Sequence, residues 1–316
     1  MALRLPTGEG VLAAAARIAG HVTRTPLLPV TIGGTRMWAK AECLQEGGSF
    51  KLRGATNRLL RLSPEERARG VVAFSSGNHA QGVAIAAGRL GVAATIVMPA
   101  DAPEVKRAAT RAAGAQIVDY DRRLESREAI AGALARERGA TLVPSFDDVD
   151  IIEGQGTAGV EIGEQLGQAP DRVLVCCGGG GLSAGIALAL PGSRIVAVEP
   201  EGWDDMGRSL DAGTPVPVAD DAPPTRCDAL QTKLVSPLTL QPLIDAGAEA
   251  VSVSEAEVAA AMRFAFRELR LVVEPGGAVA LAAALAGRGG PLTERSVILL
   301  SGGNVDPACF AEVLAA

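Results

Sequence analysis

The most informative stretch of this sequence is Gly48-Ser49-Phe50-Lys51-Leu52-Arg53-Gly54-Ala55. It sets Lys51 among apolar neighbours, where the neutral amine is favoured and becomes a better nucleophile and base. Only four lysines occur in the 316 residues, so few side chains can supply an amine. Taken by itself, Lys51 is better explained as a surface lysine beside the start of a helix.

A second polar group, Ser75-Ser76-Gly77-Asn78-His79, comes directly after an expected strand at residues 71–74. Open α/β sheets place ligands where their strands end. Two hydroxyl groups and the first N–H groups of a helix can hold a carboxylate there. Ser75 or Ser76 can also cap the helix, and the two interpretations are compatible.

A run of four glycines, Gly178, Gly179, Gly180 and Gly181, lies between an expected strand at 172–177 and a helix beginning at Leu182. Glycine permits positive φ and lets backbone N–H groups approach a phosphate closely. Together with a nucleophilic amine, such a loop suits an aldehyde cofactor that carries a phosphate, which is pyridoxal phosphate.

The rival interpretation of the glycine run is the dinucleotide site of an NAD-dependent oxidoreductase. Glu199 lies about 20 residues further on, where a ribose-binding acid would stand. The fingerprint fails at its third glycine, because Gly179 and Gly181 would require glycine at Ala184.

Two further groups are weaker signals taken alone. Ser301, which follows the last expected strand, could meet a heterocycle nitrogen, although an ordinary tight turn explains it as well. Glu199, Trp203 and Asp205 could hold a hard divalent cation through two carboxylates and a backbone carbonyl. A solvated acidic loop is the simpler account of these three residues.

Short apolar runs alternate with helical segments, which predicts the α/β class with parallel sheets. The expected strands are 71–74, 94–98, 115–118, 172–177, 194–198 and 296–300. The expected helices are 78–90, 103–113, one from 182 onward and 254–269, with a loose loop at 211–226. Before the first strand, Ser63-Pro64-Glu65-Glu66 carries an N-cap serine, a proline at the first helical position and a capping-box glutamate. We therefore expect two α/β sheets in one chain.

Composition limits the class of protein. The formal net charge of −6 argues against a nucleic-acid binder, and the two histidines exclude a multi-histidine metal site. The five cysteines match neither a zinc module nor a disulfide framework, and no uncharged apolar run is long enough to span a membrane. We expect a cytoplasmic enzyme of small metabolites, with neither nucleic acid nor membrane as a partner.

Taken in order, these motifs resemble the fold type II pyridoxal-phosphate enzymes, and among them the serine/threonine dehydratase and serine racemase group. The resemblance covers nearly the whole chain. Its landmarks are Thr25-Pro26-Leu27, Lys40, Gly48 to Ala55, Ser75 to Gln81, Gly154-Gln155-Gly156-Thr157, Gly178 to Leu182, Glu274-Pro275 and Ser301 to Asp306.

The resemblance implies a tryptophan synthase β-subunit-like fold, with two parallel-sheet α/β domains. A large pyridoxal-phosphate-binding domain would comprise residues 1–60 and 148–316, and a small α/β domain, residues 70–147, would be inserted in it. It also implies a homodimer.

The resemblance assigns roles as well. Lys51 is expected to carry the cofactor covalently, Phe50 to lie against its ring, Asn78 to bond its 3-hydroxyl group, and Ser301 to face its ring nitrogen. The glycine run with Leu182 is expected to bind the phosphate. Substrate would be held by Ser75, Ser76, Gly77, Asn78 and His79, and at its far end by Arg127. Glu199, Trp203 and Asp205 match a divalent-cation site, for Mg²⁺ or Ca²⁺.

The activity implied is an ammonia-lyase that converts L-serine or L-threonine to a 2-oxo acid and ammonia, with Lys51 as base. Alternatives are a threo-3-hydroxyaspartate dehydratase and a serine racemase, the latter with Ser76 as a second acid–base group. The substrate stays open, because Cys227-Asp228-Ala229-Leu230 stands where the family commonly has Ala-Asp-Gly.

Overall fold

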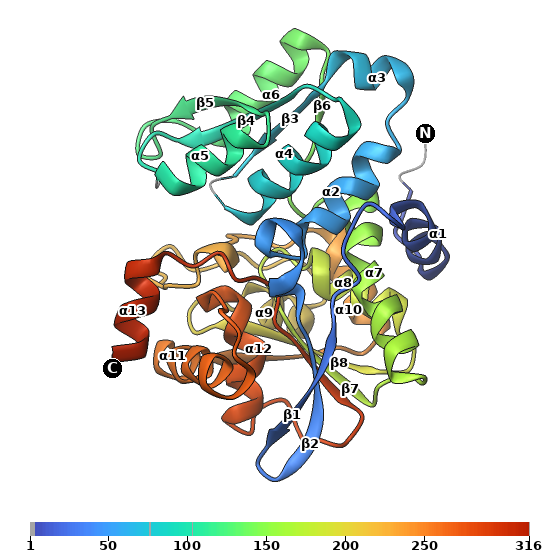
Figure 1. The fold of residues 1–316 in the computed structure, drawn as a ribbon, viewed down its shortest axis with the longest axis vertical. Coiled ribbons are helices and arrows are strands. Elements are labelled where there is room, and N and C mark those ends of the chain that lie inside the picture. Colours follow the sequence, from blue (N-terminus) through green and yellow to red (C-terminus); the bar gives the residue numbers. More distant parts are fainter. Residues whose placement is uncertain (1–3, 76, 103, 316) are drawn as a thin grey trace.

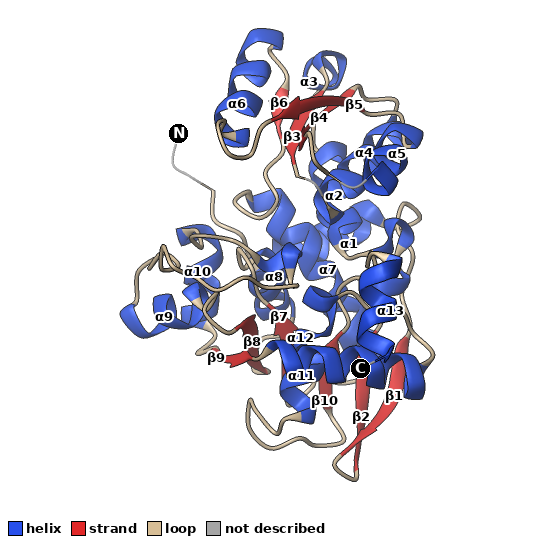
Figure 2. Ribbon diagram, turned by 90° about the vertical axis from the view of Figure 1, so that its left-hand side faces the viewer, coloured by secondary structure: helices blue, strands red, loops and turns tan. Residues whose placement is uncertain are grey.

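The computed structural model describes residues 4–75, 77–102 and 104–315 of the chain. These residues form two β-sheets at opposite ends of the molecule, with helices packed around each (Figure 1; Figure 2). The α/β class with two parallel sheets, expected from the alternating pattern, is confirmed.

The larger sheet has six strands in the order β1-β2-β10-β7-β8-β9. Their bounds are β1 (Leu27–Ile32), β2 (Thr35–Lys40), β7 (Arg172–Cys176), β8 (Arg194–Pro200), β9 (Glu249–Val253) and β10 (Ser296–Leu299). All neighbours pair in parallel except β1 and β2, which form an antiparallel hairpin. Gly33 and Gly34 turn this hairpin with φ of 57° and 83°, the geometry that two-residue hairpin loops require.

The smaller sheet has four parallel strands in the order β5-β4-β3-β6. Their bounds are β3 (Val71–Phe74), β4 (Ala94–Pro99), β5 (Gln116–Tyr120) and β6 (Thr141–Leu142). The helices beside this sheet are α3 (Pro64–Arg69), α4 (Asn78–Leu90), α5 (Glu104–Ala112) and α6 (Arg127–Arg138).

The other α-helices are α1 (Gly8–Ile18), α2 (Lys51–Leu60), α7 (Val149–Leu166), α8 (Gly181–Ala189), α9 (Asp205–Ala212), α10 (Pro237–Asp245), α11 (Glu255–Phe264), α12 (Pro275–Leu285) and α13 (Pro307–Ala315). Short helical turns are η1 (Glu42–Leu44), η2 (Glu46–Gly48), η3 (Asp228–Leu230) and η4 (Ala265–Leu269). Within the described residues, no helix combines the length and the apolar character needed to cross a bilayer.

The elements expected from the sequence are present, with shifted ends. The serine-proline start at residues 63–66 forms a complete capping box at α3. The helix expected to run to Leu269 is α-helical only to Phe264 and then widens into a π-helical turn, which ends at Arg270 with φ of 59°. The hairpin β1–β2, the strands β6 and β9 and several helices had not been expected; these helices are α1, α6, α7, α9, α10, α12 and α13.

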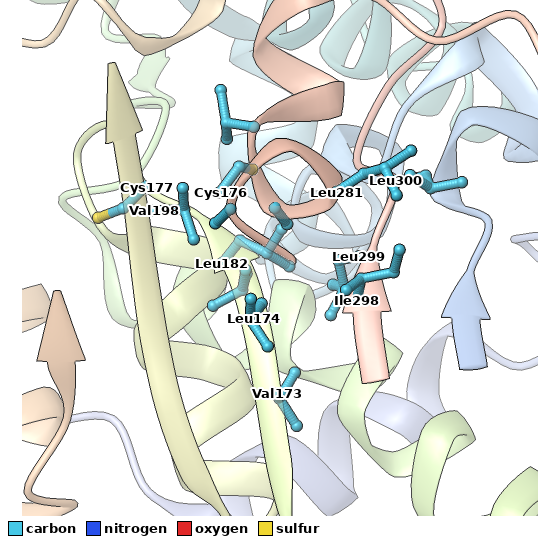
Figure 3. Close-up of a cluster of buried hydrophobic side chains, with 14 of the residues drawn as sticks. Val173, Leu174, Cys176, Cys177, Leu182, Val198, Leu281, Ile298, Leu299 and Leu300 are labelled. Carbon is cyan, nitrogen blue, oxygen red and sulfur yellow. The ribbon is translucent and has the colours of Figure 1, made fainter. Parts of the chain in front are cut away.

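The core of the larger sheet explains why its central strands are continuous apolar runs. Every residue of β7 is buried, as parallel strands covered on both faces must be. Val173 and Leu174 of β7 lie beside Ile298 and Leu299 of β10, and helices α8 and α12 contribute Leu182 and Leu281 (Figure 3). Small residues dominate α12, so its backbone can pack closely against the strands.

The division of the chain into domains at residues 60, 70 and 147 stays a proposal. The two separate sheets support it, since strands β3 to β6 all lie within residues 71–142.

Candidate active site

The site lies where strands of both sheets end. A cleft of about 690 Å³ is lined by Phe74 and Ser75 at the end of β3, by Tyr120 at the end of β5, and by Lys51. Next to it, a chamber of about 60 Å³ is lined by the glycine run after β7 and by Ser301 after β10. Lys51 lines both spaces, so the two share this residue as part of their walls.

Lys51 is the first residue of α2, and its ammonium group has a sparse environment. The Nζ atom donates to the carbonyl oxygen of Ser145 at 3.0 Å and lies 5.1 Å from the centre of the Phe50 ring. Burial lowers the pKa of Lys51 from 10.5 to about 8, because a charged amine is poorly solvated there. The neutral amine that covalent chemistry needs is therefore accessible near neutral pH.

A buried ion network holds the helix that begins at Lys51. The Arg53 side chain, which is 0% exposed, forms two-point contacts with Glu42 and with Glu161, at 2.7 to 2.9 Å. Lys40, also fully buried, binds Glu161 at 2.6 Å. The two cations balance the two carboxylates, and bidentate contacts fix direction as well as distance. The network thereby ties α2 to η1, β2 and α7.

The glycine run forms a cradle of unsatisfied backbone donors. Gly180, with φ of 85°, is the N-cap of α8. In the described part of the chain, the N–H groups of residues 178–183 have no protein acceptor. A Cβ at Gly179 would lie 2.3 Å from the Phe146 ring, so glycine is required for this approach. Free N–H groups at a helix N-terminus suit a phosphate, so the residues present fit the phosphate of pyridoxal phosphate.

The remaining chamber residues also suit the rest of that cofactor. Phe50 and Ser301 are 8% and 3% exposed and both line the chamber. Phe50 supplies an aromatic face, and Ser301 a hydroxyl group without charge. The chamber therefore offers the amine, the phosphate donors, the ring contact and the hydroxyl that the sequence had predicted.

Asn78 is held by two partners. Its Nδ2 atom donates to Glu274 Oε1 at 2.5 Å, and its Oδ1 atom accepts from Asn304 Nδ2 at 2.8 Å. Burial raises the pKa of Glu274 to about 7, and the nearby Asp228 carboxylate adds to the rise. Glu274 lines both spaces and had been noted in the sequence only as a landmark. A lone acid opening an otherwise apolar helix, α12, is the signal that could have identified it.

The expected substrate loop borders the cleft at the start of α4. Ser75 Oγ accepts from the Gly77 N–H group at 3.1 Å, and Gly77 is the N-cap of α4. His79 is buried, and burial lowers its pKa to about 3, so its ring is neutral. Its Nε2 atom already bonds the Val143 carbonyl at 2.9 Å. Ser76, predicted as the second acid–base residue, lies outside the described residues.

Arg127 lines the same cleft from the first turn of α6. Its guanidinium lies 5.6 Å from the centre of the Phe74 ring and pairs with Glu128 at 2.8 Å. Lys106, which had not been singled out from the sequence, reaches the cleft from α5. The rarity of lysine was the signal that could have identified Lys106, since the chain contains four lysines.

The three expected cation ligands lie within β8 (Glu199), at the start of α9 (Asp205) and in the turn between them (Trp203). Glu199 accepts from the N–H groups of Met206 and Gly207 at 2.9 Å each. Both oxygens of Asp205 are buried and lack a hydrogen-bond partner among the described residues. Burial raises the pKa of Glu199 to about 8 and that of Asp205 to about 7. Two buried carboxyl groups, one of them unpartnered, fit a hard cation with oxygen ligands.

The same contacts weaken the dinucleotide alternative. In that interpretation the Glu199 carboxylate would bind a ribose, but the N-terminal turn of α9 already engages both of its oxygens.

Known proteins match this chain over almost its whole length. A family model described as "Pyridoxal-phosphate dependent enzyme" matches residues 18–302. An L-threo-3-hydroxyaspartate ammonia-lyase from a Pseudomonas species is 42% identical, over 99% of each chain. The structure of maize serine racemase superposes with a TM-score of 0.91 at 35% identity, covering 99% of this chain and 98% of that one. A threonine deaminase from T.th. superposes with a TM-score of 0.87 at 43% identity, covering 95% and 99%. These matches give no support to the oxidoreductase alternative.

Proposed function

Because this chain belongs to the pyridoxal-phosphate dependent enzymes, we propose that it is an ammonia-lyase whose preferred substrate is a 3-hydroxyaspartate. The reaction removes water from a β-hydroxy amino acid, and the product hydrolyses to a 2-oxo acid and ammonia. The observation that most supports this substrate is that Lys106 and Arg127 line the same cleft as Lys51. L-Serine and L-threonine, the first expectation from the sequence, have no second carboxylate for these cations.

The similarity to the Pseudomonas ammonia-lyase supports the same choice. A serine or threonine enzyme has support of its own, from the likeness to serine racemase and threonine deaminase. Lys106 and Arg127 favour the first of these, because a lysine or arginine facing an uncharged substrate end would gain little from it.

Each residue of the site has a chemical task in this reaction. Bound pyridoxal phosphate would supply an electron sink for charge at the substrate α-carbon. The phosphate would rest on the N–H groups of residues 178–183, and the substrate α-carboxylate on the N-terminus of α4 beside Ser75. Lys51, released as a neutral amine, would take the α-proton as general base. The β-hydroxyl group would then leave as water, taking up the proton that Lys51 removed from the α-carbon.

Ser301 bears on the choice of reaction. It carries no charge, so it would not keep a ring nitrogen protonated as a carboxylate would. A weaker electron sink favours prompt loss of a β-leaving group. Racemisation of serine through Ser76 stays a prediction, as residue 76 lies outside the described part of the chain.

We also propose a divalent cation, Mg²⁺ or Ca²⁺, at Glu199, Asp205 and the Trp203 carbonyl group. The support is the unpartnered, buried carboxylate of Asp205. A cation there would be held by residues of both β8 and α9. Helix α9 also contacts the glycine run, since the Met206 side chain packs near Gly180. Its role would be structural support of the loop.

A substrate panel tests the function. L- and D-forms of serine, threonine and threo- and erythro-3-hydroxyaspartate are assayed for 2-oxo acid and ammonia, with and without Mg²⁺. We expect kcat/KM for one 3-hydroxyaspartate isomer to exceed that for L-serine by about 10- to 100-fold, the worth of a charged hydrogen bond.

Lys51→Ala is the control for the panel, and should abolish both the visible absorbance of bound cofactor and the release of ammonia. A wild-type enzyme that prefers serine or threonine over every 3-hydroxyaspartate isomer would refute the proposed substrate.

A further inference from the structure

One ion pair crosses the active-site cleft from one part of the molecule to the other. Lys106 belongs to α5, beside the four-stranded sheet, whereas Asp228 begins η3, beside α12 and the glycine run. The two residues are 122 positions apart in sequence, and Lys106 Nζ lies 3.0 Å from Asp228 Oδ2. Both side chains line the cleft that contains Lys51.

The two partners differ in their exposure to water. The Lys106 side chain is 19% exposed and that of Asp228 is 56% exposed. An ion pair that is open to water contributes little to stability, so the exposed carboxylate can return to water at little cost. Lys106 can therefore exchange this anion for another one in the cleft.

The pair lies close to the reacting centre. The pKa of Glu274 responds to both partners, since Asp228 raises it and Lys106 lowers it. Glu274 in turn bonds Asn78 at 2.5 Å. The next two residues after Asp228, Ala229 and Leu230, line the chamber of the glycine run. A substrate held between Lys51 and α4 is therefore near Lys106.

We infer that Lys106 receives the side-chain carboxylate of a dicarboxylic substrate, and that Asp228 occupies this position as an internal stand-in until the substrate arrives. This inference rests on the proposed function and names the residue that gives it selectivity. Serine brings no second carboxylate, so it would leave the Lys106–Asp228 pair intact.

The other cation of the proposed substrate contact has its partner on its own helix. Arg127 pairs with Glu128, the next residue on its own helix, and stacks on Phe74. Binding a substrate carboxylate there would break a contact within α6, whereas exchange at Lys106 releases an exposed residue from a different part of the chain. Lys106 is thus the cleft cation whose exchange of partners would break a contact between two distant parts of the chain.

The test compares Lys106→Gln and Asp228→Asn in the holoenzyme. The matched controls are Arg107→Gln and Asp119→Asn, which break a neighbouring pair of 2.6 Å between α5 and β5 that does not line the cleft. Two quantities are measured: kcat/KM for 3-hydroxyaspartate and for serine, and the Kd for succinate by calorimetry. Succinate is a dicarboxylate without an amine, so its binding is read without turnover.

For Lys106→Gln we expect kcat/KM on 3-hydroxyaspartate to fall about 10- to 100-fold, mainly through KM, and succinate binding to weaken similarly. Serine turnover should fall much less, because serine brings no second carboxylate for Lys106. For Asp228→Asn we expect succinate to bind about 2- to 5-fold more tightly, because an exposed competing anion has been removed. The control variants should change neither quantity.

The inference is overturned if Lys106→Gln loses serine and 3-hydroxyaspartate turnover equally, or if succinate binds the variant as well as the wild type. If the wild type acts on 3-hydroxyaspartate while Lys106→Gln keeps its selectivity, the inference fails and the proposed function stands. If the wild type prefers serine, the proposed function fails, and the proposed role of Lys106 in selectivity fails as well.

Discussion

At residue 51, burial has two consequences that can be measured separately. It lowers the pKa of the amine to about 8. It also limits the partners of the amine, which donates a hydrogen bond to the Ser145 carbonyl oxygen. In the folded state the ammonium form is disfavoured relative to the unfolded chain. The unfolded state therefore binds more protons between pH 8 and 10.5, so this residue contributes a stability that rises with pH in that window.

We expect the rate at which the apoenzyme takes up pyridoxal phosphate to rise with pH, with a midpoint near 8, because only the neutral amine attacks an aldehyde. Rapid mixing with the cofactor, followed by visible absorbance, measures this rate. Lys51→Ala should develop no lysine-linked absorbance. A midpoint near 10.5, the ordinary lysine value, would show that the amine is solvated and contradict the burial argument.

At the scale of elements, the site depends on the loop and helix that come after β7. A strand, four glycines and the helix α8 turn the backbone so that its N–H groups face the chamber. Phe146, which precedes α7, packs directly against the glycine run, and its ring excludes any side chain at Gly179. The two elements are placed independently along the chain, and only their packing makes a cradle.

Gly179→Ala should weaken cofactor binding, because its Cβ would lie 2.3 Å from the Phe146 ring and the loop must shift. Overpacking of this kind costs about 1–3 kcal/mol, which corresponds to a rise in cofactor Kd of roughly 5- to 150-fold. Fluorescence titration of the apoenzyme measures the Kd.

Gly163→Ala is the matched control for Gly179→Ala. This glycine lies within α7, and its Cβ would make an ordinary contact of 3.5 Å with Leu190. The substitution should leave the cofactor Kd unchanged and slightly favour the helix. Equal cofactor affinity in the two alanine variants would contradict a phosphate site at the glycine run.

At the scale of the whole molecule, two sheets with separate strands meet at one cleft. Two of the contacts that join different parts of the molecule are ion pairs or networks of them. The Arg53 network joins the helix of Lys51 to the larger sheet, and the Lys106–Asp228 pair crosses the cleft. The first is buried and permanent, whereas the second is partly exposed and suited to exchange. Association into a homodimer, which the resemblance implies, stays a prediction.

The proposed cation site can be tested at this scale by measuring the thermal stability of the folded protein. We expect Mg²⁺ or Ca²⁺ to raise Tm by several degrees, since ligand at about 100 times its Kd adds about 2.7 kcal/mol. Asp205→Asn should remove that response, because it neutralises the buried, unpartnered carboxylate. Differential scanning calorimetry of the apoenzyme in EDTA, before and after adding the cation, measures it. An equal response in the variant and the wild type would leave the acidic pair without a metal role.

Much of the fold could be predicted, because it is encoded locally. Apolar runs such as Val71–Phe74 and Ser296–Leu299, and the capping box at Ser63, act over a few residues and specify strands and a helix start directly. The ends of elements and the π-helical turn after Phe264 were missed, since packing sets them. The hairpin β1–β2 was missed as well, although its Gly33-Gly34 turn is a local signal.

By itself, the sequence determined the family and predicted the reactive amine and the phosphate loop, since these depend on residue types in a fixed order. Only the tertiary structure decided the setting of those residues: the lowered pKa of Lys51, the Glu274–Asn78 contact, and the meeting of Lys106 with Asp228 across 122 positions. The physical reason is that desolvation and charge pairing depend on distance in space. Distance in space is set by how the two sheets pack, and no short stretch of sequence carries that information.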